Sequence, residues 1–505
     1  MEQLLSIFGG IRKEVAAHLD EQAINAACRE EKYTWRERLF NPTNTVHMFM
    51  LQILNRNTAL NDLPRKSHES FTGSAFCKAR RRLPLRVFQR LLRSLAETLL
   101  PHPGGERIDK EGRWCGHRTF IMDGSSCSMP DTPELQRHFG QPGNQRPGCG
   151  FPVAHLLVLF HAGTGLLREI LTSPLRTHDM SQVVQLHAAL QPGDIGLGDR
   201  GFCSYAHLAL LSLRGVFGVF RIHQQRKVDF QLVEPSDSDA AATRSGRLPR
   251  WLYRLGARDH VVEWIKPKKA PAWMTTSQYA TLPQRQVVRE LRYPVGQPGF
   301  RVREVTLVTT LLDPELYPLE ALAELYRQRW QAELHLRDLK TTMNMDVLKC
   351  KTVDGVLKEI HVFALVYNLV RVVLQAGARR QHLPIARLSH IDAFRWLASA
   401  HEGEALPKIV VNPDRPDRVE PRVVKRRPKE YDRMTRPRAE LRRQLLEGKA
   451  VASGSPSEKR AERKGNERGR GDSRFVSGSR RVITRVCPYS VHQGGRRCHD
   501  LLQIC

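Results

Sequence analysis

Four side chains that can bind a metal ion or a phosphate group are spaced for one face of a helix in the segment 325–343, LYRQRWQAELHLRDLKTTM. Successive residues of an α-helix are about 100° apart, which places four of them within an arc of about 60°: Tyr326, Arg329, Glu333 and Lys340. Apolar residues occupy the neighbouring arc and are expected to pack on a core: Leu325, Ala332, Leu336, Leu339 and Met343. A carboxylate in one row with a phenol, a guanidinium and an ammonium, beside a core, suits a metal-dependent phosphodiester site.

The same segment also has a simpler interpretation. Arg329 and Glu333, like Glu333 and Arg337, are four residues apart and could be ordinary ion pairs on a solvated helix. The remaining side of the helix carries polar residues that are expected to meet water: Arg327, Gln328, Gln331, His335 and Asp338. Metal chemistry therefore requires further carboxylates from elsewhere in the chain.

Two upstream aspartates follow short apolar segments that are expected to be strands. TFIM (119–122) leads into Asp123, and IGLG (195–198) leads into Asp199. A carboxylate at the end of a buried strand is a common arrangement for a metal ligand. Asp123 could equally form a turn through its own side chain, and Asp199 could pair locally with Arg200.

The segment 115–223 alternates between apolar runs and turn signals in an order that favours an α/β fold. It predicts three strands, a helix, a strand, a helix and a final strand. This is the order of the ribonuclease H-like fold, in which the first and fourth strands are neighbours. Asp123 on the first strand and Asp199 after the fourth would then converge.

Residues 1–110 are expected to form an N-terminal helical domain. SAFCKARRRLP predicts a helix with Ser74 as its N-cap and four cations near its C-terminal end: Lys78, Arg80, Arg81 and Arg82. Pro84 then begins a second helix. Such a pair of helices can bind the DNA backbone or enter a groove. Cations at a helix C-terminus are also favoured by the helix dipole alone, so both interpretations stay open.

The chain has 505 residues, enough for two or three domains, and a formal net charge of +28 with a pI near 10.1. A charge excess of this size implies a polyanionic partner, most simply nucleic acid. The sequence has no run of eighteen apolar residues and no signal-peptide pattern, so we expect a cytoplasmic protein without a membrane partner. The ten cysteines include no C-x2-C pair, and we expect reduced thiols and no zinc site.

The segment between Asp199 and Glu333 is too long for a plain ribonuclease H-like core. It indicates a β-rich insertion at 224–301, in which DFQLV (229–233) is one predicted strand, with the core resuming at 302–375. Residues 376–449 form a basic C-terminal region, in which KRRPK (425–429) suits a phosphate-tracking arm. Residues 450–505 are low in complexity, basic and expected to be disordered.

The spacing Tyr-x2-Arg-x3-Glu-x6-Lys, preceded by two aspartates on predicted strands, resembles the YREK signature of DDE transposases of bacterial insertion sequences. The resemblance extends over roughly residues 70–445 and favours the cut-and-paste subgroup with a β-rich insertion domain. It implies a ribonuclease H-like catalytic core at 115–223 and 302–375. The N-terminal helical DNA-binding domain and a helical, basic C-terminal region would flank this core.

The resemblance also assigns roles to individual residues. Three correspond to the acids of the family that catalyse the reaction and hold two Mg²⁺ ions, for which Mn²⁺ can substitute: Asp123, Asp199 and Glu333. Four more correspond to its DNA-contacting residues: Tyr326, Arg329 and Lys340 at phosphates and Trp330 at a base. The N-terminal domain, with its cationic cluster, would grip the transposon end.

The implied partners are double-stranded DNA and a second copy of the chain. The DNA would be the terminal inverted repeats and then the target, and a homodimer would form in the synaptic complex, with contacts through residues 376–449. The implied location is the bacterial cytoplasm, with binding to the nucleoid through DNA.

Two other functions compete with this one. The first is a host nuclease or resolvase with a ribonuclease H-like fold, against which the row of four residues argues. The second is an inactive copy retained as a sequence-specific DNA-binding protein, against which the presence of all three acids argues. Cleavage of DNA that carries the flanking inverted repeats would separate the three functions.

Overall fold

The computed structural model describes residues 13–67, 69–101, 113–143, 145–177, 179–223, 225–231, 249–295, 304–401, 404–413 and 436–447. The chain divides into two compact units, residues 1–145 with 150–427 and residues 146–149 with 428–505. The second unit contains the helix α17 (Arg438–Leu446). The predicted phosphate-tracking arm (425–429) and the predicted disordered tail (450–505) lie outside the described residues. The sheet and the candidate site belong to the first unit.

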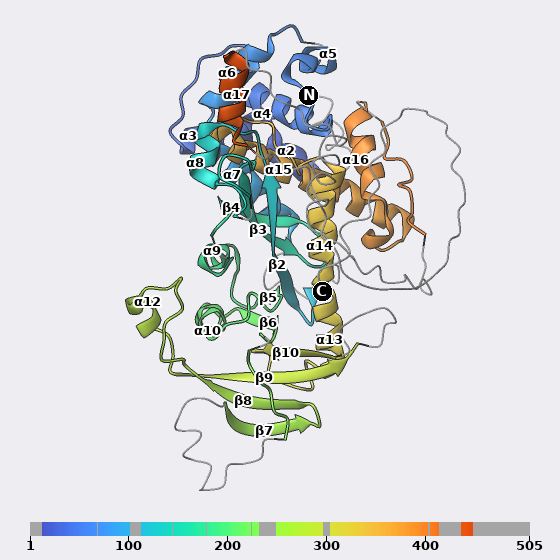
Figure 1. Ribbon diagram of the computed structural model, residues 1–505. Helices are drawn as coiled ribbons and strands as arrows, with labels where there is room; N and C mark the ends of the chain where they lie inside the picture. The colour runs from blue at the N-terminus through green and yellow to red at the C-terminus, as the bar shows by residue number, and fades with distance from the viewer. Residues whose placement is uncertain are drawn as a thin grey trace, which may run out of the picture. The chain divides into compact units, whose positions relative to one another are not determined.

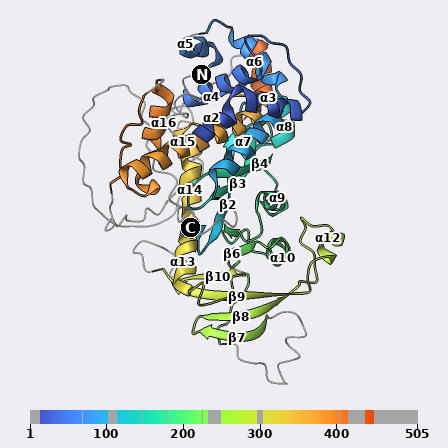
Figure 2. The same ribbon diagram turned by 180° about the vertical axis from the view of Figure 1, so that it is seen from behind.

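The described part of the N-terminal region is helical, as predicted. Its helices are α2 (Lys13–Leu19), α3 (Glu21–Glu30), α4 (Pro42–Leu54), η1 (Leu60–Asp62), α5 (Leu63–Ser67), α6 (Gly73–Arg82) and α7 (Leu85–Leu99). In Figures 1 and 2 they gather beside the long helix α15 (Val353–Gln381), onto which α7 and α4 pack. The N-cap of α6 is Thr72, whose hydroxyl accepts the Ala75 N–H, so the prediction of Ser74 as the cap was wrong by two residues.

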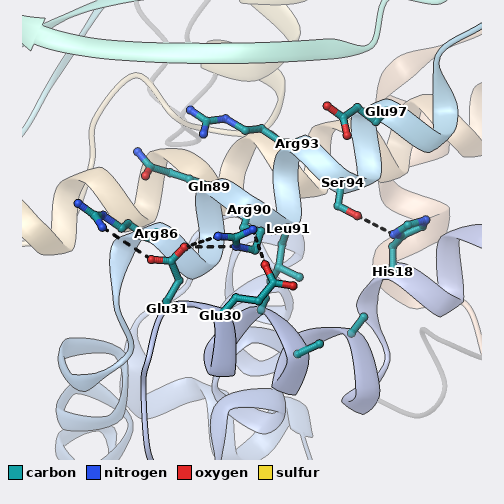
Figure 3. A pocket seen from close by; sticks show the side chains of 13 residues that line it. His18, Glu30, Glu31, Arg86, Gln89, Arg90, Leu91, Arg93, Ser94 and Glu97 are labelled. Atoms are coloured by element: carbon teal, nitrogen blue, oxygen red, sulfur yellow. Dashed lines mark hydrogen bonds and ion pairs between the residues drawn. The ribbon is translucent and has the colours of Figure 1, made fainter. Parts of the chain in front are cut away.

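A hollow of about 600 Å³ lies between the N-terminal helices α2, α3 and α7 (Figure 3). Some of its charged side chains pair with one another, whereas Arg93 and Glu97 pair with Glu169 and Arg168 outside it. Arg90 pairs with both Glu30 and Glu31, and Arg86 lies 4.0 Å from Glu31. These pairs tie α3 to α7, so the hollow belongs to the packing of the helical region.

One continuous sheet runs through the described residues in the order β4-β3-β2-β5-β6-β10-β9-β8-β7. Its first part consists of β2 (His117–Ser128), β3 (Val153–His161), β4 (Leu167–Pro174), β5 (Ile195–Gly198) and β6 (Phe217–Arg221), and the short β1 (Arg113–Trp114) pairs with the beginning of β2. Strands β2, β3 and β4 are antiparallel, whereas β5 is parallel to both β2 and β6. The element order predicted for 115–223 is therefore confirmed, with one additional helix, α8 (Pro133–Phe139), after β2.

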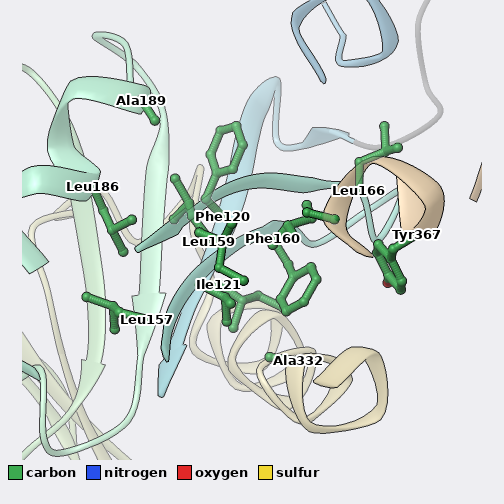
Figure 4. Packing of buried hydrophobic residues seen from close by; sticks show 14 of the residues in the cluster. Phe120, Ile121, Leu157, Leu159, Phe160, Leu166, Leu186, Ala189, Ala332 and Tyr367 are labelled. Carbon is green, nitrogen blue, oxygen red and sulfur yellow. The ribbon is translucent and has the colours of Figure 1, made fainter. Parts of the chain in front are cut away.

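The centre of this sheet is buried on both faces, which explains why β3 reads as a nearly continuous apolar run. Figure 4 shows Leu186 of α9 (Asp179–Leu186) on one side of the strands, and Ala332 and Tyr367 on the other. Ile121 and Phe160 are fully buried between these layers. Close packing of this kind makes β2 a rigid support for the side chains that it presents.

The segment 325–343 is not the single straight helix that its periodicity predicts. Helix α13 (Leu319–Arg327) ends before α14 (Trp330–Arg337) begins, and η3 (Asp338–Thr342) is a π-helical turn. A π-helical turn holds more residues than an α-helical one, so it changes the direction of the side chains that follow. His335 is buried and the Asp338 side chain is largely so, and the prediction that both face water was therefore wrong.

Helix α15 closes the core behind this segment. It is long and apolar enough to span a membrane, but 89% of its apolar stretch is buried inside the first unit. The burial identifies it as a core helix. It is followed by η4 (Ile385–Arg387) and by α16 (His390–Ser399), which packs on α15 and on α4.

The insertion extends the central sheet. Its strands are β7 (Arg250–Gly256), β8 (Asp259–Ile265) and β9 (Arg285–Pro294), with the short helix α12 (Thr276–Ala280) between β8 and β9. Strand β9 pairs antiparallel with β10 (Glu304–Thr309), which in turn pairs with β6. The described residues 229–231 of the strand predicted at 229–233 are not in a strand.

Candidate active site

Asp123 lies inside a strand and not at its end. Strand β2 continues to Ser128, and Asp123 is opposite Val158 of β3. The Gly124 N–H donates to Asp123 Oδ1 at 2.9 Å. Because the chain stays extended through this point, the alternative that Asp123 forms a turn was wrong.

Asp199 follows β5, the parallel neighbour of β2. The register pairs Thr119 with Ile195 and Ile121 with Leu197, an offset of 76 residues in both pairs. The same offset carried two residues further takes Asp123 to position 199 (123 + 76 = 199). Neighbouring strands are about 4.8 Å apart, so the two aspartates leave the sheet at one level and on one face.

Glu333 reaches the same region from a helix. It lies on α14, which packs across β2 through the buried Ala332 (Figure 4). Both Nη atoms of Arg329 donate to Glu333 Oε1 at 3.2 Å. The ion pair that the simpler interpretation predicts is therefore present. It lies against the aspartates and not on a solvated face, because the charge of Arg329 acts on Asp123 as well.

The charges of the three acids act on one another. The pKa of Asp123 is raised to about 7, chiefly by burial; the charge of Arg329 opposes this rise, and the negative charges of Glu333 and Asp199 add to it. Burial also raises the pKa of Glu333, and Asp199 adds to that rise while Arg329 opposes it. The three acids therefore carry more negative charge than Arg329 compensates, which is the condition that a bound cation relieves.

The donor set fits a hard divalent cation, because carboxylate oxygens are the ligands that Mg²⁺ and Mn²⁺ prefer. The acids are not yet gathered around a common point. Among the described residues, no three His, Cys, Asp and Glu side chains are close enough to form a complete metal site. The Glu333 carboxylate instead faces Arg329.

The other members of the predicted row are divided between two regions. Tyr326 is 7% exposed, and burial raises its pKa, while the nearby charges include those of Arg329, Arg221 and Asp199. The Nζ of Lys340 lies 3.4 Å from the Asp346 carboxylate. Its positive charge also opposes the rise in the pKa of Cys127 that burial causes, so Lys340 lies near Cys127. Cys127 is four residues beyond Asp123, about 13 Å along β2. Lys340 thus lies toward the end of β2, whereas Tyr326 lies across the sheet, near the ends of β6 and β9.

Trp330 is the first residue of α14 and is half-buried. Sequence patterns did not identify two other residues near the row, Arg221 and Tyr293. Arg221 ends β6 and Tyr293 lies on β9. The pKa of Tyr293 is raised to about 12 by burial, and the nearby positive charges of Arg221 and Arg329 oppose this rise. Their contribution depends on strand pairing, which leaves no motif in the sequence.

The cationic cluster of α6 is split by the fold. Lys78, Arg81 and Arg82 are exposed. The guanidinium of Arg80 instead lies over the rings of Phe49 and Phe76, 4.5 and 5.1 Å from their centroids, and donates to Gln52 Oε1 at 3.0 Å. Arg80 therefore takes part in the packing of α6 on α4.

Comparison with known proteins identifies relatives of this arrangement. The family model described as "Transposase DDE domain" matches residues 114–369. The transposase InsG for insertion sequence element IS4 of Escherichia coli (strain K12) is 23% identical over 382 residues, which cover 71% of this chain and 77% of InsG. The putative transposase InsZ of the same strain is 24% identical over 250 residues, which cover 48% of this chain and 77% of InsZ. Among solved structures, the piggyBac transposase synaptic complex with hairpin DNA aligns with a TM-score of 0.40 and 9% identity, covering 78% of this chain and 79% of that one.

Proposed function

Because this chain belongs to the transposase DDE domain family, we propose that it cleaves DNA at the ends of an insertion sequence and joins them to target DNA through Asp123, Asp199 and Glu333. The observation that carries the assignment is the parallel register of β2, which holds Asp123, and β5, which Asp199 directly follows, with Glu333 presented from α14 across β2. A host nuclease or resolvase is disfavoured because both relatives are described as transposases.

The strand order supports a ribonuclease H-like core within the α/β fold. Three antiparallel strands, β4, β3 and β2, continue into the parallel strands β5 and β6, with helices on both faces. We place this core at 115–223 and 302–375, the β-rich insertion at 224–301 and the DNA-binding helices at 1–110. In a cut-and-paste element, residues 376–449 would then contribute to a homodimer, and the protein would act on DNA in the bacterial cytoplasm.

Asp123, Asp199 and Glu333 would hold two Mg²⁺ ions, or Mn²⁺ in their place. When bound, these ions would activate a water or a 3′-hydroxyl as the nucleophile and stabilise the leaving oxygen. Arg329 donates two hydrogen bonds to the Glu333 carboxylate and would hold it until a cation competes for it. Tyr326 is protonated at neutral pH, as any tyrosine with an ordinary pKa is, and burial raises its pKa further, so its hydroxyl can donate to a phosphate oxygen.

The remaining contacts would position the DNA. Lys340 can pair with a phosphate further along β2, and Trp330 offers a half-buried indole ring on which a base can stack. In α6, Lys78, Arg81 and Arg82 are exposed and can contact phosphates. Arg80 instead fixes α6 to α4 through its hydrogen bond to Gln52.

The test is single-turnover cleavage, with Mg²⁺, of a duplex that carries the inverted repeat flanking the gene. We expect Asp123→Asn, Asp199→Asn and Glu333→Gln each to fold and bind the duplex but to lose cleavage and strand transfer. One missing carboxylate is enough, because it prevents two ions from being held together. Glu324→Gln is the matched control, since Glu324 is exposed on α13 and pairs with Arg327. A near-normal rate from any of the three variants would remove that residue from the site.

A further inference from the structure

Two buried histidines lie beneath the loop that carries Asp199. His207 is on α10 (Tyr205–Leu213) and His187 is on η2 (His187–Ala189), and both are almost completely buried. His207 Nδ1 lies 2.7 Å from the Phe202 carbonyl oxygen, and His207 Nε2 lies 2.9 Å from His187 Nε2. The residues form a chain of hydrogen bonds from η2, through α10, to the loop.

The partners determine where the protons lie. A carbonyl oxygen only accepts, so His207 Nδ1 must carry a proton and donate it to Phe202. Burial lowers the pKa of His187 to about 2 and that of His207 to about 4, so both rings are neutral at pH 7. The Nε2 of His207 therefore has a lone pair, and His187 donates its Nε2–H to it.

The bond to Phe202 limits the freedom of the Asp199 turn. The Phe202 N–H donates to the Asp199 carbonyl at 3.2 Å, and the Gly201 N–H donates to Asp199 Oδ1 at 2.7 Å. On the other side, the Phe202 side chain packs so closely on Gly198 that a Cβ there would lie 3.0 Å from Phe202 Cβ. Phe202 is thus the point at which the turn is fixed to the interior.

We propose that His207 is a positioning residue for Asp199. Its Nδ1–H bond to the Phe202 carbonyl, oriented by His187, fixes the turn and with it the direction of the Asp199 carboxylate toward Asp123. The inference rests on the proposed function, because that function makes the direction of Asp199 matter. Both histidines are buried, and their hydrogen bonds lead to the Phe202 carbonyl, so they would act on Asp199 through the backbone.

The test compares two replacements that are similar in polarity but place the donor differently. His207→Asn puts its amide nitrogen near the position of Nδ1 and can restore the bond to Phe202, whereas His207→Gln puts its amide nearer the position of Nε2. We expect His207→Asn to cleave the inverted-repeat duplex at close to the wild-type rate. His207→Gln should be slower by about tenfold or more, the usual effect of losing a residue that orients a metal ligand. Binding of the duplex should be unchanged in both.

A matched control separates positioning from folding. His361 on α15 is also buried, and its Nδ1 lies 2.8 Å from the Leu357 carbonyl oxygen. His361→Asn and His361→Gln should cleave at equal rates even where their melting temperatures differ. Equal cleavage by His207→Asn and His207→Gln, or rates that follow melting temperature across all four variants, would overturn the proposal.

His187 provides a second comparison, which decides the matter if both His207 variants fail to fold. His187→Gln keeps a donor for His207 Nε2, whereas His187→Leu does not. Only His187→Leu should therefore cleave slowly. Equal cleavage rates of these two variants would overturn the proposal. The proposed function fails separately. If Asp199→Asn cleaves normally, Asp199 is not catalytic and the proposed function fails. If Asp199→Asn is inactive but His207→Asn and His207→Gln cleave at equal rates, only the positioning role of His207 is refuted.

Discussion

Arg329 determines the charge balance of the site at the scale of single residues. It donates twice to Glu333, and its charge counteracts the rise in the pKa of Asp123 that burial causes. A cation bound by the acids would compete with this guanidinium for the Glu333 carboxylate. A phosphate would in contrast gain a partner if Arg329 turned from Glu333 toward it.

The consequence is a prediction for Arg329→Gln. We expect weaker binding of the inverted-repeat duplex but no loss of Mg²⁺ affinity, because the variant removes a phosphate contact and a competitor for Glu333 at the same time. Gel shifts report the first quantity, and the Mg²⁺-induced rise in melting temperature reports the second. Arg327→Gln, an exposed neighbour paired with Glu324, is the control. A variant that binds DNA normally but no longer responds to Mg²⁺ would reverse the assigned roles.

Residue types and predicted elements identify the three acids, but they do not identify the residues that position those acids or that pack the elements. Asp123, Asp199 and Glu333 stand out because each lies where a predicted strand or helix presents it. His207 and Arg80 do not stand out, because their partners, Phe202 in one case and Gln52 in the other, become relevant only once the chain has folded. In the sequence alone, His207 is one of 20 histidines and Arg80 is one of many arginines, and nothing distinguishes either from the others.

At the scale of elements, α6 shows how packing divides a run of like charges. The helix turns Phe76 and Arg80 toward α4 and leaves Arg81 and Arg82 outside. Two carbonyls of its last turn, those of Arg80 and Arg81, accept hydrogen bonds from the buried Nζ of Lys358 on α15. The end of α6 is therefore fixed to the core, with two arginines projecting from it.

This division predicts different effects for neighbouring arginines. Replacing Arg81 and Arg82 together by Ala should weaken DNA binding and lower the salt slope by up to about two units, one for each phosphate that is no longer neutralised. Arg80→Ala should instead lower the melting temperature with little change in the slope, because its guanidinium is already bound to Gln52 and the aromatic rings. Salt titrations of duplex binding measure the first effect. An unchanged slope in the double variant would leave Arg81 and Arg82 as a solvated helix end.

A buried ion pair joins the elements that carry the two aspartates. Arg118 at the start of β2 forms two hydrogen bonds of 2.7 Å with Asp194, just before β5, and both side chains are buried. Removing one partner leaves the other charge buried, so Asp194→Asn should lower the free energy of unfolding by about 3–5 kcal/mol. Urea denaturation measures this loss. The double variant Arg118→Met/Asp194→Leu should recover part of it, and a single variant as stable as wild type would show that the pair is not desolvated.

The π-helical turn marks the limit of reasoning from periodicity. A projection of 100° per residue places Lys340 in line with Glu333, but η3 intervenes and Lys340 instead lies toward Cys127. Nothing in DLKTT distinguishes a π-helical from an α-helical turn. The choice depends on tertiary contacts, such as the pairing of Lys340 with Asp346 in the following segment.

At the scale of the whole molecule, local signals predicted the centre of the fold and missed its extent. The strands and helices between 117 and 221, except α8, follow from apolar runs bounded by turn residues, and their order determines the meeting of Asp123 and Asp199. The continuation of the sheet through β10 into β7 depends on pairing between β6 and β10, which are distant in sequence. Long-range pairing of that kind leaves no periodic signal within either strand.

The same core contains several histidines that are kept neutral, and His390 gives the clearest test of their effect on stability. Burial lowers its pKa to about 3, and the charges of Arg371 and Arg337 add to that effect. Neither ring nitrogen has a hydrogen-bond partner among the described residues, and the ring stacks on Tyr367 with centroids 5.6 Å apart. The folded protein therefore uses the ring as an aromatic group and gains nothing from its protonation.

We therefore predict that His390→Phe makes the protein more resistant to acid. Above pH 6.5 neither the folded nor the unfolded chain protonates position 390, so the variant should resemble wild type. As the pH falls from 6.5 toward 3, the unfolded wild-type chain takes up a proton that the folded chain cannot, and wild-type stability falls. The advantage of His390→Phe in the free energy of unfolding should thus grow by about 1.4 kcal/mol for each pH unit below 6.5. Urea denaturation at pH 7, 6 and 5 measures it, and the exposed His401→Phe is the control. Parallel dependence on pH in His390→Phe and wild type would mean that His390 is protonated in the folded protein.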